Sequence, residues 1–367
     1  MSSAGRRPLE PSADIVVGLG WGDEGKGATV DALAAANRPN RVVRFNGGQQ
    51  AAHNVIANGV HHTFSSYGSG VFSDVDTWIS RFCTVDPLAI AEERIALRKK
   101  NLFPLLFVDE EAPVTTAIHI AANISRDSVN NHGTTGTGFG ETVYYSLHHD
   151  ALRVKHLRNL DTILDYIVAL NNFYQERGLV RQLTFGEQLT IATELQMANN
   201  NFAKVRGEHL TEALQSGYTV FEGAQGFVLD ENFGFSPHTT WSTTTPANAR
   251  KLLREAGVEN VRTIGCLRTY ATRHGNGPLP HEGKLPFRPE EPHNADDNAQ
   301  GLFRVAPHDP DIIEWAVDTT GVDTLSISHL DVFDKMQTSC GMMSLEELPK
   351  PVLMEAYGPR REDRIFR

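Results

Sequence analysis

The chain has 367 residues, of which 40% are hydrophobic and 22% are charged, the composition of an ordinary globular protein. Its 34 Lys and Arg residues stand against 45 Asp and Glu residues, and the net charge of −11 argues against a general binder of nucleic acid or of anionic membranes. No stretch approaches the ~18 apolar residues of a membrane-spanning helix. Three widely spaced cysteines, Cys83, Cys266 and Cys340, favour reduced thiols and a cytoplasmic location.

Residues 1–13 are expected to form a flexible polar lead-in, and residues 14–367 a single domain. At the start of that domain, the β-branched run 15–17, the glycine-rich segment 18–27 and the amphipathic segment 28–33 predict a strand, a loop and a helix. A loop in this position presents backbone N–H groups at the start of a helix, where phosphate oxygens bind. A tight turn without function is the alternative interpretation of this segment taken alone.

The loop has the spacing of a P-loop, with two departures. Gly20, Gly25 and Lys26 match Gly-x-x-x-x-Gly-Lys, in which the lysine reaches the terminal phosphates of a nucleotide. The next residue is Gly27 instead of the Ser or Thr that holds magnesium, and an acid, Asp23, lies inside the loop. A phosphate loop that loses its metal-binding hydroxyl and gains a carboxylate is predicted to take part in chemistry as well as in binding.

Strands and helices alternate along the rest of the chain. Helical periodicity is strongest in 86–100, 160–177 and 185–215, and the proline-rich stretch 278–292 is typical of a long surface loop. This alternation predicts an α/β fold with a mostly parallel, twisted central sheet, helices on both faces, and ligands at the carboxyl ends of the strands. The further β-like runs are 41–45, 105–108, 218–221, 261–266 and 324–327.

Several later loops carry glycine, threonine, histidine or acidic residues in an unusual order. Each loop alone has an ordinary structural interpretation, as a turn, a surface histidine or the end of a strand. In chain order the loops are 46–54, which contains His53, then 131–140, then 221–226 with the threonine-rich 239–245 after it, then 272–278 and 328–334.

Taken together, these motifs closely resemble the adenylosuccinate synthetase family, from about residue 14 to the end of the chain. The family motifs Trp-Gly-Asp-Glu-Gly-Lys-Gly and Glu-Gly-Ala-Gln-Gly match residues 21–27 and 222–226 without a change. The resemblance implies a P-loop-like nucleotide-binding architecture and a homodimer. It also implies a ligase that joins L-aspartate to C6 of a purine nucleoside monophosphate and consumes a nucleoside triphosphate.

The resemblance assigns the chemistry to a few residues. Asp23 would take the N1 proton of the base, which makes the 6-oxygen nucleophilic, and His53 would donate a hydrogen bond to the transferred phosphate. Lys26 and Mg²⁺ would neutralise phosphate oxygens, with the metal held by Asp23 and by the backbone oxygen of Ala52. Gln225 would hold the reacting nucleotide.

The same motifs imply the residues that bind the substrates. Aspartate is expected at Gln300, Gly301 and Arg304. Asp331 matches the residue that reads the base of the triphosphate, and Gly358-Pro359 matches the loop beside that base. The residues expected to contact the nucleotides are Gly22, Glu24, Gly25, Gly27, Gln50, Thr134, Thr135, Gln225, Thr240, His329, Asp331, Gly358 and Pro359.

Several positions depart from the family pattern. Residues 50–53 read Gln-Ala-Ala-His in place of Asn-Ala-Gly-His, and His329 stands where the family has a lysine. The arginine-rich loop that grips aspartate is replaced by residues 298–304, which keep one arginine. The arginine that reaches into the neighbouring subunit falls in 147–149, which read Leu-His-His. The chain is also shorter than the bacterial and eukaryotic enzymes.

These departures resemble the phage-type branch of the family, which converts dGMP into the succino precursor of 2-aminoadenine in the host cytoplasm. Some members of that branch replace the loop aspartate by a smaller residue, whereas this chain keeps Asp23. The retention of Asp23 keeps IMP as an alternative substrate. From the resemblance to the phage-type branch we expect a ligase acting on dGMP with Mg²⁺ and ATP or dATP. The alternatives are an ordinary adenylosuccinate synthetase that uses IMP and GTP, including the short archaeal type, and a P-loop switch without turnover, against which Asp23 and His53 argue.

Overall fold

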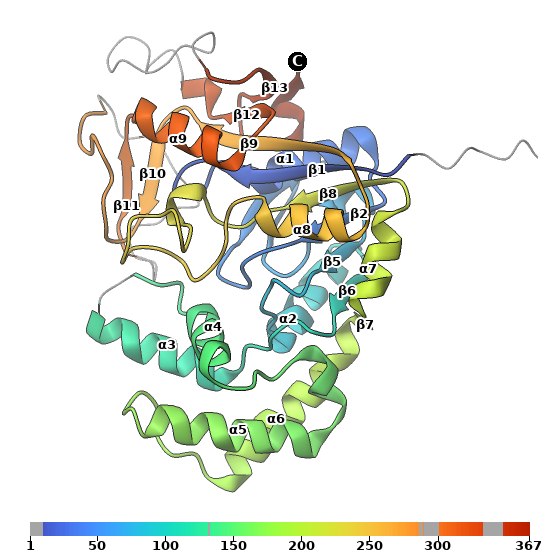
Figure 1. The fold of residues 1–367 in the computed structure, drawn as a ribbon, viewed down its shortest axis with the longest axis vertical. Coiled ribbons are helices and arrows are strands. Elements are labelled where there is room, and N and C mark those ends of the chain that lie inside the picture. The colour runs from blue at the N-terminus through green and yellow to red at the C-terminus, as the bar shows by residue number, and fades with distance from the viewer. Residues whose placement is uncertain (1–9, 131–132, 286–288, 290–300, 333–347) are drawn as a thin grey trace, which may run out of the picture.

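A ten-stranded sheet forms the centre of the protein (Figure 1). The computed structural model describes residues 10–130, 133–285, 289, 301–332 and 348–367. The strand order is β14-β13-β12-β9-β1-β8-β2-β5-β6-β7, and every neighbouring pair is parallel except β13 and β14. The mostly parallel sheet predicted from the sequence is thereby confirmed.

The strands of this sheet are β1 (Ser12–Gly18), β2 (Arg41–Arg44), β5 (Thr77–Ile79), β6 (Leu106–Asp109), β7 (Ala203–Val205), β8 (Tyr218–Glu222), β9 (Asn260–Arg268), β12 (Thr324–Ser328), β13 (Val352–Ala356) and β14 (Arg364–Phe366). Two antiparallel strand pairs lie outside the sheet, one formed by β3 (His53–Ala57) and β4 (Val60–Phe64) and the other by β10 (Ala271–His274) and β11 (Phe303–Ala306). All of the β-like runs predicted from the sequence overlap strands of the main sheet.

β1 lies between β8 and β9 in the middle of the sheet, and its sequence explains this position. Ile15 and Val17 pack into the apolar core on one face, whereas Val16 packs into the core on the other face, and all three are fully buried. A parallel strand that is buried on both faces requires a continuous apolar run of this kind. The glycine-rich loop therefore leaves the sheet at its centre.

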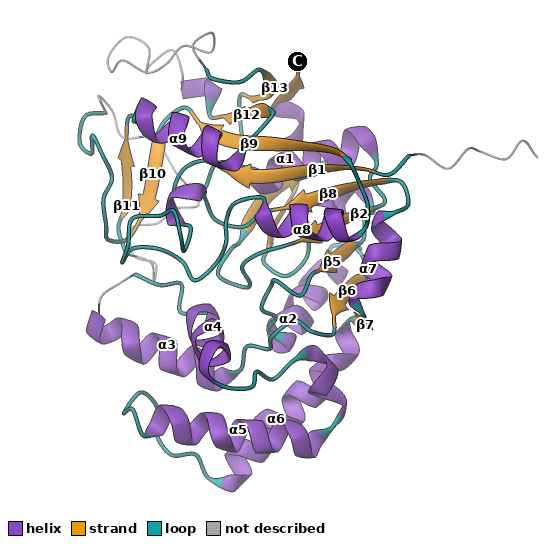
Figure 2. Cartoon of the chain, in the orientation of Figure 1, coloured by secondary structure: helices purple, strands orange, loops and turns teal. Residues whose placement is uncertain are grey.

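Helices cover both faces of the sheet, as predicted (Figure 2). α1 packs on one face through Val30 and Leu33, whereas α7, α8 and α9 contribute to the core on the other face. No helix in the described part of the chain is long and apolar enough to cross a membrane. The helices are α1 (Lys26–Asn37), α2 (Pro87–Arg98), α3 (Ala117–Asn130), α4 (Phe139–His148), α5 (Leu160–Gln175), α6 (Phe185–Ala198), α7 (Gly207–Leu214), α8 (Ala247–Glu255) and α9 (Pro310–Thr320).

α3, α4, α5 and α6 form a helical layer, drawn below the sheet in Figure 1. Their buried side chains belong to a third apolar core that also includes residues of α2, β5 and β6. In this core His119 is fully buried, with its ring centroid 6.1 Å from Tyr145, 6.4 Å from Tyr166 and 6.2 Å from Tyr174. Burial lowers the pKa of His119 to about 3, so the imidazole is neutral.

The helical segment expected over 185–215 is divided into two helices. α6 ends at Ala198, the 3₁₀ turn Asn199–Asn201 follows, and α7 begins only after β7, which extends the sheet beside β6. Asparagine side chains compete with the helix for backbone hydrogen bonds. Asn201 does so here, because its amide donates to the carbonyl of Ala198 at 2.8 Å. Periodicity alone did not reveal this interruption.

Candidate active site

A cavity of about 1820 Å³ is lined by residues at the carboxyl ends of the sheet strands and by residues of α3 and α4. Ligands of parallel α/β sheets bind at this edge of the sheet. The residues predicted from the sequence that line the cavity are Gly22, Asp23, Gly25, Lys26, Gly27, Gln50, Ala52, His53, Thr134, Thr135, Gln225, Thr240, His329, Asp331, Gly358 and Pro359.

Glu24 organises the glycine-rich loop from the inside. Its buried carboxylate accepts hydrogen bonds from the backbone N–H groups of Gly20 at 3.0 Å and Gly22 at 2.7 Å. It also accepts a hydrogen bond from Lys26 Nζ at 2.7 Å. The side chain of Glu24 thus fixes the loop and the lysine, so a contact between Glu24 and a nucleotide would use its backbone.

The close approach of His53 explains Gly27. A Cβ atom on Gly27 would lie 2.4 Å from the Cβ of His53 and 2.8 Å from Ser69 Oγ. The first turn of α1 therefore has no room for the Ser or Thr of a usual P-loop. His53 occupies the space beside α1 that the side chain of a Ser or Thr at position 27 would need.

His53 starts strand β3 and is almost fully buried, whereas the sequence predicted that it lies in the loop 46–54. Its Nδ1 lies 2.5 Å from Glu222 Oε1, and Glu222 also accepts hydrogen bonds from the hydroxyl and the N–H of Ser69 at 2.5 and 2.8 Å. Desolvation raises the pKa of Glu222, but the hydrogen bond from His53, the charge of Arg44 and the hydrogen bond from Ser69 outweigh it, and the pKa lies below its usual value. Glu222 is therefore ionised.

The ring of His53 presents its second nitrogen to the site. Desolvation lowers the pKa of His53, and the hydrogen bond to Glu222 opposes that shift without reversing it. The neutral ring donates Nδ1–H to Glu222, and Nε2 has no hydrogen-bond partner among the described residues. Since His53 lines the cavity, Nε2 is the group left for a ligand.

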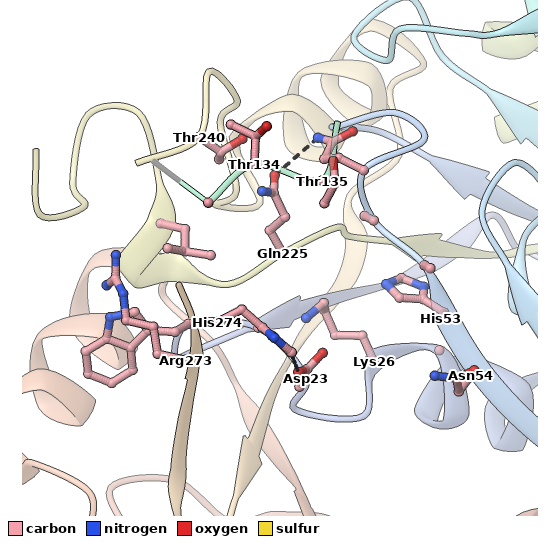
Figure 3. A pocket seen from close by; sticks show the side chains of 18 of the residues that line it. Asp23, Lys26, His53, Asn54, Thr134, Thr135, Gln225, Thr240, Arg273 and His274 are labelled. Atoms are coloured by element: carbon pink, nitrogen blue, oxygen red, sulfur yellow. Dashed lines mark hydrogen bonds and ion pairs between the residues drawn. The ribbon is translucent and has the colours of Figure 1, made fainter. Parts of the chain in front are cut away.

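The Asp23 carboxylate lies against His274 (Figure 3). Oδ2 is 3.0 Å from His274 Nε2, and 38% of the Asp23 side chain is exposed. Desolvation raises the pKa of Asp23, but the hydrogen bond from His274 and the charges of His274, Arg268 and Lys26 outweigh it and lower the pKa to about 2. Asp23 is therefore ionised, and a proton donor on a ligand competes with His274 for it.

Backbone strain is concentrated at the cavity. Asp23, Gln225 and His329 have φ angles of 60°, 61° and 63°, in the left-handed region that side chains disfavour. Each of these conformations costs on the order of 1 kcal/mol or more. Asp23 and His329 follow β1 and β12, and Gln225 follows β8, so the strain lies where the strands open into ligand-binding loops.

Threonine hydroxyls form a second polar group in the cavity. Thr134, Thr135 and Thr240 gather around the side chain of Gln225, away from Asp23 and Lys26 (Figure 3). Gln225 Oε1 accepts a hydrogen bond from Gln50 Nε2 at 3.3 Å. We call the region of Thr134, Thr135 and Thr240 the threonine end, because its hydroxyls can donate to phosphate oxygens but carry no charge.

His329 and Asp331 lie where β12 opens into the cavity. Burial and the charge of Arg268 hold the pKa of His329 well below its usual value, so the imidazole is neutral. Its Nε2 is 3.0 Å from Arg268 Nη2. Asp331 lies in the 3₁₀ turn Leu330–Val332 with its side chain exposed.

Of the predicted aspartate-binding residues, Gly301 and Arg304 are not among the residues that line this cavity. Arg304, on β11, pairs with Glu282 through Nε at 2.8 Å and Nη2 at 2.5 Å, and its Nη1 donates to the carbonyls of Gly275 and Gly277. Gly301 has φ 86° and packs near Gly275, whereas Gln300 lies outside the described residues. Because the Arg304 fork is used within the protein, its contact with aspartate stays a prediction.

Comparison with known proteins decides the family. The model of the adenylosuccinate synthetase family matches residues 15–340. The chain belongs to the adenylosuccinate synthetase family. The synthetase of Anaplasma marginale is 28% identical over 358 residues, which cover 91% of this chain and 83% of that relative. The synthetase of Buchnera aphidicola is 32% identical over 286 residues, which cover 73% of this chain and 64% of that relative.

Solved structures share the fold of this synthetase. The fully ligated adenylosuccinate synthetase from Plasmodium falciparum superposes with a TM-score of 0.79 over 96% of this chain and 99% of that one. The succinoaminodeoxyadenylate synthetase PurZ of cyanophage S-2L, bound to dGMP and dATP, superposes with a TM-score of 0.69 over 98% and 96%. Sequence identity is 17% in both cases, so these similarities concern the fold alone.

Membership of the adenylosuccinate synthetase family makes the chain a carbon–nitrogen ligase that acts on nucleotide and aspartate substrates. Among the described residues there is no group of three or more His, Cys, Asp or Glu side chains that could hold a metal ion. The site instead fits an Mg²⁺ ion that keeps waters and binds one carboxylate and substrate phosphates. Asp23 is an exposed carboxylate in the cavity, and Ala52 lines it as well.

Three side chains of the synthetase site were not predicted from the sequence. Glu222 and His274 lie within motifs that were recognised, but nothing in those motifs indicated that they hold His53 and Asp23. Arg126, on α3, lies in no motif and lines the cavity only because the fold brings α3 to the sheet. The sequence signal that could have indicated Arg126 was a basic residue shortly before the loop 131–140.

Proposed function

We propose that this synthetase joins L-aspartate to C6 of dGMP with ATP or dATP as phosphate donor, which gives 2-amino-2′-deoxy-N6-succinyladenylate for 2-aminoadenine synthesis. The observation that carries the proposal is the exposed Asp23 carboxylate, of which one oxygen is bonded to His274. A base that displaces His274 can use both oxygens of the carboxylate for two parallel N–H bonds, and guanine presents N1–H beside its 2-amino group. Hypoxanthine offers N1–H alone.

Two further features support the proposal. Gln50 bonds to Gln225 in the cavity, and its amide lies one methylene further from the backbone than that of the asparagine in the family pattern. His329 is a neutral ring in place of the family lysine, which removes a charge next to the base of the triphosphate and fits ATP or dATP better than strict GTP use. PurZ of cyanophage S-2L, which shares the fold, was solved with dGMP and dATP.

The first chemical step forms a 6-phosphoryl nucleotide. Asp23 takes the N1 proton and the 6-oxygen attacks the γ-phosphorus, while the bond to the β-phosphate oxygen breaks and leaves ADP or dADP. Lys26, held by Glu24, lies ready to neutralise the phosphate oxygens. The charges of the bound phosphates and of ionised Glu222 favour uptake of a proton from solvent at His53 Nε2, which then donates to the phosphate as charge develops.

In the second step the neutral amine of aspartate attacks C6 and forms the C–N bond, while the C6–O bond breaks. Phosphate leaves with the former 6-oxygen, and the nitrogen loses a proton to solvent. Gln225 and the threonine end hold the nucleotide during both steps, and Gln300, Gly301 and Arg304 are assigned to aspartate. Mg²⁺, held by Asp23, the Ala52 carbonyl and phosphate oxygens, would supply further charge neutralisation when bound. We also propose a homodimer in the cytoplasm, which is the host cytoplasm if a phage encodes the protein.

Ordinary adenylosuccinate synthesis from IMP and GTP is the second candidate. Asp331 favours it, because its exposed carboxylate in the cavity offers the acceptor that N1–H and the 2-amino group of GTP would use. The two curated relatives compared above are also ordinary synthetases. The two candidates differ in which substrate carries the 2-amino group.

Product analysis separates the candidates. Purified protein receives aspartate, Mg²⁺ and ATP, dATP or GTP with either dGMP or IMP, and the succino products are quantified. A site that pairs a buried 2-amino group discriminates against an analogue without it by a factor of up to ~10⁴. We expect kcat/KM to favour dGMP. Conversion of IMP with none of dGMP would establish the second candidate, and phosphate release that needs neither aspartate nor a monophosphate would argue against a ligase.

A further inference from the structure

We propose that Arg126 binds the phosphate of the nucleoside monophosphate at the threonine end of the cavity. The ligand class is a purine nucleoside 5′-monophosphate with either base. The inference rests on the proposed function only for the assignment of the monophosphate to this end, and it makes no use of the 2-amino group. It assigns a charged partner to a phosphate that otherwise meets hydroxyls and amides.

Arg126 is placed beside the threonine end by its neighbours on α3. Asn123, Arg126 and Asp127 are three and four residues apart, so they share one face of the helix, and all line the cavity. Asn123 Nδ2 donates to Thr134 Oγ1 at 3.1 Å. Asp127 accepts hydrogen bonds from the N–H groups of Gly133 and Thr134 at 3.1 and 3.0 Å. The loop is therefore anchored on either side of the arginine.

Glu141 fixes the guanidinium and leaves one of its edges open. Arg126 Nε and Nη2 donate to the two carboxylate oxygens of Glu141 at 2.5 and 3.2 Å, and Glu141 is buried in the first turn of α4. The guanidinium carbon lies 5.5 Å from the ring centroid of Tyr144. Nη1 of Arg126 has no acceptor within the described part of the chain, and 39% of the Arg126 side chain is exposed.

A guanidinium has two edges that can each form a fork with an oxyanion. Glu141 uses the Nε–Nη2 edge, so the Nη1–Nη2 edge remains for phosphate, already oriented before the ligand arrives. This matters because preorganised donors lose less freedom on binding. Two other cavity cations serve elsewhere: Lys26 is held by Glu24 away from the threonine end, and Arg273 donates to the carbonyls of Asn276, Pro278 and His238.

An arginine from α3 also completes the monophosphate site within one chain. The sequence has no arginine in 147–149, where the family arginine that enters the neighbouring subunit would fall. In a chain of net charge −11, a phosphate cannot rely on a general positive field and needs a local cation. Arg126 meets that need from the same subunit that supplies Thr134 and Gln225.

The test compares nucleotides with nucleosides in Arg126→Gln and Arg126→Lys. KM is measured for dGMP and IMP, and deoxyguanosine and inosine are titrated as competitive inhibitors. We expect KM for whichever monophosphate is used to rise at least tenfold in Arg126→Gln and less in Arg126→Lys, which keeps charge but loses the fork. The inhibition constants of the nucleosides and the KM for aspartate should stay within twofold.

Two control variants separate binding from structure. Arg181→Gln breaks a comparable Arg–Glu fork, formed with Glu187 at 3.0 and 2.5 Å on the exposed surface, and should leave every constant unchanged. The double variant of Arg126→Gln and Glu141→Gln removes the buried carboxylate that the single variant leaves unpaired, and should show the same loss of monophosphate affinity. Equal losses for nucleosides and nucleotides, or no loss, would overturn the proposal. If Arg126 behaves as expected but IMP is the only substrate, the inference stands and the dGMP assignment fails.

Discussion

The two walls of the cavity are built differently. The sheet wall is formed by Asp23 and Lys26, which follow β1, and by His53, which lies on β3 outside the sheet but is held by Glu222 at the end of β8. Each functional group lies against a partner, and Asp23, Lys26 and His53 are 38%, 3% and 8% exposed. In the helical wall Arg126 is 39% exposed, about as much as Asp23, and the residues of the threonine end are half-buried, but these groups are held by helix side chains and a loop instead of by strands. The comparison suggests that reacting groups are fixed by the sheet, whereas groups that grip the substrate come from helices and loops around it.

This difference has a physical basis. A residue at the end of a central parallel strand inherits the rigidity of two neighbouring strands, and Glu222 at the end of β8 is fully buried for this reason. A residue on α3 is held by one helix face and a loop. Substitutions in the sheet wall should therefore change kcat, and substitutions in the helical wall should change KM.

The largest effect is expected at Asp23 and His53. Asp23→Asn cannot take a proton, and His53→Asn keeps an amide donor near Nδ1 for Glu222 while it removes Nε2. Loss of a positioned acid or base typically costs a factor of about 10²–10⁴ in kcat. Steady-state ligation at saturating Mg²⁺ and substrates measures this, with thermal unfolding as a check on the fold. If either variant turns over like the wild type, the role assigned to that residue is wrong.

Glu222→Gln tests whether the buried carboxylate of Glu222 contributes to catalysis through His53. The variant keeps an acceptor for His53 and Ser69 but loses the negative charge that stabilises a protonated His53. A buried charged hydrogen bond is worth about 1–3 kcal/mol, so kcat should fall about ten- to a hundredfold. Monophosphate KM should hardly change. A rise in KM at constant kcat would mean that the two walls are not distinguished in this way.

Acid should destabilise the helical layer through His119. Its pKa is lowered from 6.5 in the unfolded chain to about 3, so the unfolded chain binds more protons between these values. The contribution of His119 is therefore complete above pH 6.5 and is lost as the pH falls, at about 1.4 kcal/mol per pH unit. Denaturant unfolding as a function of pH measures this slope. His119→Asn should flatten it, and an unchanged slope would assign the acid sensitivity to other groups.

The smallest effect is expected at Arg304. Arg304→Lys keeps the charge but loses the fork with Glu282, and should raise KM for aspartate about three- to tenfold with little change in nucleotide KM. Glu282→Gln is the matched control. If both variants have the same effect, Arg304 acts by holding the loop. If Glu282→Gln is silent and Arg304→Lys is not, Arg304 contacts aspartate itself.

The sheet wall and the helical wall also differ in how well the sequence predicts them. The sheet wall was predictable because its residues lie in contiguous motifs such as 21–27, and the strands that carry them are continuous apolar runs. The helical wall was not, because Arg126 and Glu141 meet only when α3 packs against α4. The partners of Asp23 and His53 were also hidden, since His274 and Glu222 lie 251 and 169 residues away in the chain.

The order of the strands has a consequence for how the protein is made. β1 is synthesised first, but its neighbours in the sheet are β8 and β9, and Ser12 pairs with Tyr218. At about 5–20 residues per second, ribosomal synthesis leaves the phosphate loop without its flanking strands for tens of seconds. The helical layer, whose contacts are more local, can form in that interval. A newly made chain therefore completes the surroundings of its phosphate loop only late in translation, after the helical layer has had time to fold.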